Sequence, residues 1–123
     1  MSSPPDESAC SILEPQRLIQ ITTGDQNLIE RILANFCADI QRQYQSLRDC
    51  CKAGSVEQQY IVLHKMKGSV GNIGGKRLEQ LLADCGDRTR QGRMAIRDED
   101  VQHIGRELDE LLNDIEKTDW AAD

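Results

Sequence analysis

The stretch HKMKGSVGNIGG, residues 64–75, holds the residue types in this chain that are best suited to chemistry. His64 is one of two histidines, and Lys67 and Gly68 follow it at spacings that place all three on one face of a helix. A neutral imidazole nitrogen is a competent nucleophile. An ammonium group one turn away could offset the negative charge of a phosphoryl group on that nitrogen. The pattern therefore predicts that His64 accepts such a group and that Lys67 stabilises its charge.

Glycines surround this histidine, although glycine weakens a helix. Gly68 and Gly71 lie four and seven residues after His64, and each should cost about 0.5–1 kcal/mol relative to alanine inside a helix. Both are expected to leave bare backbone beside the imidazole, because residues at these spacings share a helix face. The two glycines indicate that another molecule must approach His64 closely.

Other polar residues of the same segment are further candidates for binding. Lys65, Lys76 and Arg77 are cations near His64 in the sequence, and Lys65 is expected to be a surface charge. Ser69 and Asn72 could contact a phosphoryl group or a partner through their hydroxyl and amide groups. They could equally satisfy backbone groups at a helix end, so both interpretations stay open.

Five segments that could position these side chains show apolar residues at helical spacing. The expected helices cover residues 13–21, 26–53, 56–73, 78 to about 91, and 99–115. Predicted N-caps are Thr23 or Asp25, Ser55 and Asp98, and predicted stops are Gly54, Gly74–Gly75 and Gly92. On the third helix, His64 lies just beside the apolar seam of Leu63 and Met66, so it is expected at the edge of the buried face or in solvent. The prediction is an all-α fold, an antiparallel four-helix bundle with an additional short N-terminal helix.

Length and composition agree with a single helical domain. The chain has 123 residues, of which 38% are hydrophobic and 3% aromatic, enough for one modest core and unfavourable for a sheet. Residues 1–13, rich in Pro, Ser and acids, are expected to form a disordered leader before a bundle over residues 14–120. No signal peptide or membrane-spanning segment is recognisable, so we expect a cytoplasmic protein without membrane insertion.

The five cysteines, Cys10, Cys37, Cys50, Cys51 and Cys85, suggest no special chemistry. They are odd in number, contain no C-x-x-C pair and have no histidine at metal-ligand spacing. We therefore predict reduced thiols and no metal site.

Charge is distributed unevenly along the sequence. The net charge is −6, yet residues 64–97 carry eight basic and three acidic groups, whereas residues 98–123 carry two basic and ten acidic ones. An acidic chain with one basic segment is a poor binder of nucleic acids, because binding to their phosphates needs many unopposed Lys and Arg contacts. A local basic surface could still meet an acidic protein partner.

The motif HKMKGSVGNIG resembles the signature of histidine-containing phosphotransfer domains, in which His is followed by x-x-Lys-Gly and by a later Gly. The preceding F-x-x-D-I segment, Phe36 to Ile40, and the helix after the motif extend the resemblance over about residues 14–117. It implies a four-helix bundle core with a short extra helix. It also implies that His64 is the phosphoacceptor, that Lys67 lies on the phosphate side and that Gly68 clears space for the partner.

Members of that family relay phosphate between aspartates of response-regulator receiver domains, through the imidazole Nε2. The resemblance implies receiver partners, possibly those of a hybrid sensor kinase, and a monomer. It also implies that Mg²⁺ comes from the receiver, so no cofactor is expected in this chain. No P-loop or kinase Gly-rich loop is found in the sequence, so we expect a phosphocarrier without kinase activity of its own. The alternative is a non-catalytic helical adaptor that binds or inhibits a receiver or kinase, which would tolerate the loss of His64.

Overall fold

The computed structural model describes residues 11–90 and 94–121, and within these ranges the chain forms five α-helices and no strands. The helices are α1 (Pro15–Ile21), α2 (Gln26–Ala53), α3 (Val56–Ile73), α4 (Lys76–Arg90) and α5 (Asp98–Lys117). The predicted all-α fold is confirmed. The predicted leader lies outside the described residues for positions 1–10. Contacts begin before residue 14, because the Arg77 backbone N–H donates to the Ser11 carbonyl at 3.2 Å.

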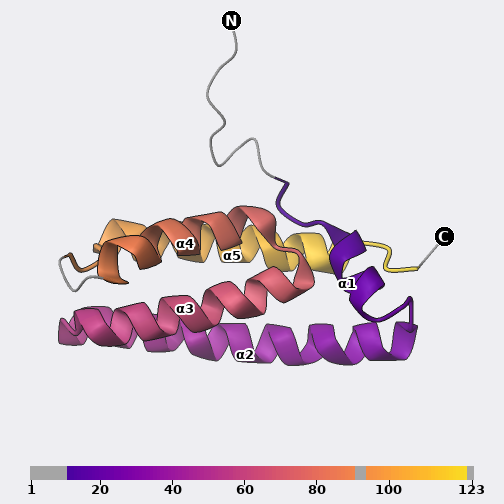
Figure 1. Cartoon of the computed structure of the whole chain (residues 1–123), viewed down its shortest axis with the longest axis horizontal. Coiled ribbons are helices and arrows are strands. Elements are labelled where there is room, and N and C mark those ends of the chain that lie inside the picture. The colour runs from indigo at the N-terminus through magenta and orange to yellow at the C-terminus, as the bar shows by residue number, and fades with distance from the viewer. Residues whose placement is uncertain (1–10, 91–93, 122–123) are drawn as a thin grey trace, which may run out of the picture.

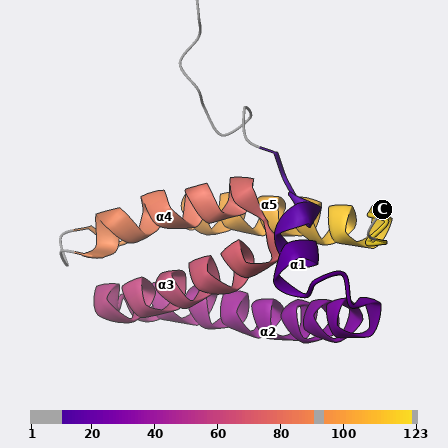
Figure 2. The same cartoon turned by 45° about the vertical axis from the view of Figure 1, so that its right-hand side comes forward.

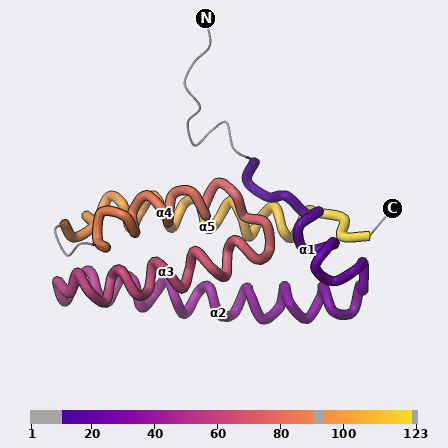
Figure 3. Tube along the Cα trace, in the orientation of Figure 1, coloured from indigo at the N-terminus to yellow at the C-terminus, as the bar shows by residue number. Residues whose placement is uncertain are grey.

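The four long helices form an antiparallel bundle, and α1 crosses one of its ends (Figure 1). Each long helix packs against its neighbours in the order α2, α3, α4, α5, and α5 also contacts α2. The turned view and the Cα trace show the same two layers, α2 with α3 and α4 with α5 (Figures 2 and 3). The α3–α4 pair and the α2–α5 pair therefore form opposite faces of the molecule.

Most helix ends within the described residues lie where the capping residues predicted them, and the predicted stop at Gly92 lies outside the described residues. The Asp25 carboxylate accepts a hydrogen bond from the Leu28 N–H at 3.2 Å, and the Ser55 hydroxyl accepts one from the Gln58 N–H at 3.3 Å. Gly54 and Gly74 end α2 and α3 in the left-handed conformation, with φ of 73° and 86°.

The prediction that Asp98 caps α5 is wrong by one residue. Asp98 is already helical, and Arg97 is the N-cap. The reason is the carboxylate of Asp100, which accepts the Arg97 backbone N–H at 2.8 Å and so closes the first turn one residue earlier.

The core runs the length of the bundle and contains the predicted apolar seams. On α3 the buried residues include Leu63, Met66 and Val70, and Leu18 of α1 closes one end of the core. The short helix is fixed there by the Glu14 N–H, which donates to the Gly74 carbonyl at 2.8 Å. Thus α1 covers the bundle end next to the α3–α4 turn.

Ion pairs join the basic helix α4 to the acidic helix α5. Arg77 pairs with Glu107 at 2.5 Å and also with Glu110, while Arg88 pairs with Asp100 at 2.9 Å. Burial alone would raise the pKa of Asp100, but its hydrogen bonds from Arg88 and Arg97 hold that pKa below its ordinary value. Part of the charge asymmetry seen in the sequence is therefore neutralised inside the molecule.

A buried glutamine holds the segment that leads into α5. Gln59 of α3 is 1% exposed, and its Oε1 accepts the backbone N–H of Ile96 at 3.0 Å. This bond satisfies a buried donor in a segment without regular structure.

Replacing Gln59 with leucine should leave the Ile96 N–H buried without its acceptor and lower the free energy of unfolding by about 1–3 kcal/mol. Urea denaturation measures the change. The matched control is Gln58→Leu, because Gln58 is exposed on the same helix and should change stability by less than about 0.5 kcal/mol. Equal stabilities of the two variants would contradict the assigned role of Gln59.

Candidate functional site

His64 lies on the outer side of α3, exposed to solvent, between the buried residues Leu63 and Met66. The expectation that it lies beside the apolar seam is confirmed. The ring of Tyr60, one turn earlier, stacks on the imidazole with centroids 6.0 Å apart and an interplanar angle of 27°. The imidazole therefore stands on α3 with one face of its ring against another aromatic ring.

A small pocket of about 130 Å³ surrounds the imidazole between α3 and α4. Its lining residues are Tyr60, Leu63, His64 and Lys67 of α3, with Leu82, Ala83, Gly86, Asp87 and Arg90 of α4. Lys67 and Arg90 bring two cations to the same hollow as the imidazole, and Asp87 brings one acid. Cations in this position could offset the negative charge of a group bound to His64.

Lys67 lies between this pocket and a larger one. The second pocket, of about 510 Å³, is lined by Ser11, Glu14, Lys67, Lys76, Glu79, Gln80 and Ala83. Lys76 and Glu79 form an ion pair across 3.9 Å within it. Lys67 is exposed, so its ammonium can reach into either of the two pockets that it lines.

The glycines of the site differ in what they do. An added Cβ at Gly68 or Gly86 would meet no atom within 4 Å, so both leave open space near His64. Gly71, by contrast, is buried, and a Cβ there would come within 2.6 Å of the Glu79 carboxylate. The prediction of bare, accessible backbone at Gly71 is therefore wrong, because a side chain of α4 covers this glycine.

The other candidates are not gathered around the imidazole. Lys65 and Asn72 are exposed on α3 but do not line its pocket. Ser69 faces α2, where its hydroxyl accepts a hydrogen bond from the Gln43 amide at 3.4 Å. Arg77 pairs with α5 and is directed away from the site, and Lys76 lines only the neighbouring pocket.

Sequence reasoning missed Tyr60 and the residues of α4 that complete the pocket. Ala83, Gly86, Asp87 and Arg90 recur at the spacing of one helix face, and this spacing was a usable signal. In an antiparallel pair joined by a tight turn, residues equally far from the turn face each other. The turn at Gly74–Gly75 brings residues near position 86 opposite His64.

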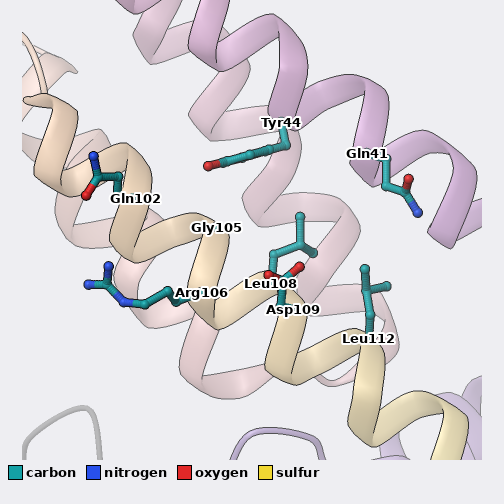
Figure 4. Close-up of a pocket in the computed structure, with 8 residues that line it drawn as sticks. All are labelled: Gln41, Tyr44, Gln102, Gly105, Arg106, Leu108, Asp109 and Leu112. Atoms are coloured by element: carbon teal, nitrogen blue, oxygen red, sulfur yellow. The ribbon is translucent and has the colours of Figure 1, made fainter.

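A larger hollow, of about 650 Å³, lies on the opposite face between α2 and α5 (Figure 4). It is lined by Gln41, Tyr44, Gln102, Gly105, Arg106, Leu108, Asp109 and Leu112. The Tyr44 hydroxyl donates its proton to the Val101 carbonyl at 3.0 Å. No histidine lines this hollow, so its larger volume does not make it the candidate site.

Neither a metal centre nor a membrane span is found in the described parts of the chain. Within residues 11–90 and 94–121, no group of three or more His, Cys, Asp or Glu side chains could hold a metal ion. In the same ranges, none of the helices has the length and apolar character needed to cross a bilayer. The described cysteines, Cys37, Cys50, Cys51 and Cys85, are free thiols.

The family model of the Hpt domain matches residues 31–117, which include the whole of α3 and α4. The chain belongs to the Hpt domain family. The structure is similar to the crystal structure of histidine-containing phosphotransfer protein B (HptB) from Pseudomonas aeruginosa PAO1, with a TM-score of 0.80 and 18% sequence identity. The match covers 88% of this chain and 94% of HptB. A search of curated proteins finds no match.

Membership of the family gives the observed geometry its context. This Hpt domain is a histidine phosphotransfer carrier of phosphorelays, and such domains work with receiver domains of response regulators. Hpt domains are phosphocarriers and not kinases. The helical bundle predicted from the sequence is the Hpt fold.

Replacing Gly68 with alanine should have opposite effects on the stability of the fold and on the rate of phosphoryl transfer. Gly68→Ala should raise the free energy of unfolding by about 0.5–1 kcal/mol, because alanine favours the helix interior and its methyl group meets no atom. The same methyl group should slow phosphoryl transfer from a receiver domain, because it fills the bare surface one turn from His64.

Urea denaturation and a transfer time course measure the two effects. Gln102→Ala is the control, because Gln102 is exposed on α5 and belongs to the opposite face. A Gly68→Ala variant that transfers as fast as the wild type would show that no partner approaches this glycine.

Proposed function

We propose that His64 is the phosphoacceptor of this carrier, which receives a phosphoryl group from a receiver-domain aspartate and passes it to another receiver. The observation that carries the proposal is an exposed imidazole in a pocket that also contains the side chains of Lys67 and Arg90. His103, the other histidine, is half-buried on α5 and lies outside the matched His-x-x-Lys-Gly motif.

The transfer step can be written in terms of the bonds that change. The lone pair of the neutral imidazole Nε2 attacks phosphorus, an N–P bond forms, and the O–P bond of the aspartyl phosphate breaks to release the aspartate carboxylate. The other ring nitrogen carries a proton that balances the charge of the new bond until solvent accepts it. Transfer to the next receiver reverses these changes.

Within this chain, the pocket supplies charge compensation and access. Lys67 and Arg90 flank the position of the phosphoryl group from α3 and α4, and both are exposed and able to follow it. Gly68 and Gly86 leave room for the donor. We propose that Mg²⁺ is supplied by the receiver and that the chain needs no cofactor of its own. It has no kinase activity by this proposal, and the lack of a P-loop in the sequence supports this.

Several expectations from the sequence stay predictions. They are a monomeric state, a cytoplasmic location, and supportive roles of Lys65, Ser69 and Asn72 in binding the partner. The same holds for a link to a hybrid sensor kinase.

His64→Gln should abolish phosphate acceptance and leave the fold intact, because an exposed imidazole contributes little to the core. The measurement is transfer from a ³²P-labelled receiver domain, with acid and alkali stability of the label. The matched control, His103→Gln, should accept label as the wild type does. Label retained by the His64→Gln variant would disprove the assignment, and a folded wild type that binds receivers without taking label would favour the adaptor alternative.

Lys67→Ala should slow transfer by about tenfold, the effect of losing one charge-assisted contact of roughly 1.4 kcal/mol with the transferring group. Circular dichroism should show an unchanged helical fold, because the side chain is exposed. Lys117→Ala serves as the control, since Lys117 is an exposed lysine on α5. If the Lys67→Ala variant transfers phosphate at the wild-type rate, Lys67 is only a surface charge and does not assist transfer.

A further inference from the structure

The stacking of Tyr60 on His64 is the contact that orients the proposed nucleophile. Tyr60 precedes His64 by four residues, and long side chains on a helix lean toward its N-terminus onto the preceding turn. The imidazole accordingly lies against the tyrosine ring, with the centroids 6.0 Å apart and the planes at 27°. Aromatic pairs at this separation interact favourably.

Little else holds the imidazole in one orientation. Across residues 11–90 and 94–121 it makes no hydrogen bond or ion pair, and Tyr60 is its one ring contact. An exposed histidine on a helix can occupy more than one χ1 rotamer, and the χ2 torsion that turns its ring is broad. Without Tyr60, the ring nitrogens would point in several directions.

Tyr60 itself is well placed to be a fixed support. It is half-buried, next to the fully buried Gln59, and it lines the same pocket as Arg90 across the α3–α4 interface. Because the Tyr60 side chain is already half-buried, it loses less conformational freedom than an exposed side chain would when a partner docks.

We propose that Tyr60 is a positioning residue that holds the His64 imidazole in the orientation needed for transfer from a receiver. This inference rests on the proposed role of His64. Transfer between two proteins requires the attacking nitrogen to lie about 3–3.5 Å from phosphorus and in line with the leaving oxygen. A receiver docked on the bundle fixes the position of phosphorus, so the imidazole must already point toward it. The aromatic face provides the support, and the tyrosine hydroxyl is not needed.

The test compares two phosphoryl donors with two variants. The donors are a phosphorylated receiver domain and phosphoramidate, a small molecule that transfers its phosphoryl group to imidazole with release of ammonia. Phosphoramidate diffuses to the nitrogen in any orientation, so its reaction reports access and intrinsic reactivity. The variants are Tyr60→Leu, which keeps apolar volume but removes the ring, and Tyr60→Phe, which keeps the ring.

The Tyr60→Leu variant should transfer from the receiver about tenfold more slowly at saturating donor, a modest loss for a misoriented group, and should react with phosphoramidate at the wild-type rate. The Tyr60→Phe variant should match the wild type with both donors. Tyr44→Leu is the matched control, because Tyr44 belongs to the α2–α5 face, and it should not separate the two donors.

A second readout detects the stack without any phosphoryl transfer. The ring-proton NMR shifts of His64 should move in the Tyr60→Leu variant and stay near the wild-type values in the Tyr60→Phe variant, because the ring current of residue 60 acts on them. Unmoved shifts in the Tyr60→Leu variant would overturn the stacking. Receiver transfer at the wild-type rate, or an equal loss with both donors, would overturn the positioning role. Label on His64→Gln, or none on the wild type, would instead overturn the proposed function.

Discussion

The close antiparallel packing of α3 against α4, set by the turn at Gly74–Gly75, is the constraint on which the remaining structure depends. A Cβ at Gly74 would lie 2.3 Å from the Glu14 carbonyl oxygen, and one at Gly75 would lie 2.8 Å from a Val70 methyl group. Only glycine fits both positions without a shift of the backbone or core. The turn thereby fixes the register of the two helices, and that register decides which residues of α4 stand opposite His64.

The basic residues of segment 64–97 include one group that faces α5 and another that faces the imidazole pocket. Arg77 and Arg88 point to α5, where acidic partners bind them and hold the α4–α5 layer together. Lys67 and Arg90 face the imidazole pocket. Arg77 and Arg88 are thus engaged within the molecule, whereas Lys67 and Arg90 are among the cations of the segment that stay exposed.

Local signals predicted the helices well because caps and stops act within a few residues. Asp25, Ser55 and Gly54 behave as their residue types suggest, and the error at Asp98 arose from a carboxylate three residues inside the cap. The part of the site on α3 was likewise visible as a motif. The α4 part depended on the pairing of two helices, and the coverage of Gly71 by Glu79 depended on the conformation of one long side chain. Spacing along α4 shows which of its residues share a face, but not that this face lies opposite His64 or that Glu79 covers Gly71.

The imidazole of His64 is exposed, and it lines a pocket of only about 130 Å³ between α3 and α4. In the proposed carrier, a phosphoryl group on His64 would therefore stay open to water whenever no partner is docked. The lifetime of that group would then depend on how fast water hydrolyses the N–P bond, because excluding water is what a closed site would add. In the proposed carrier, contacts that distinguish one receiver from another would have to lie on the surface around the pocket, apart from the imidazole itself.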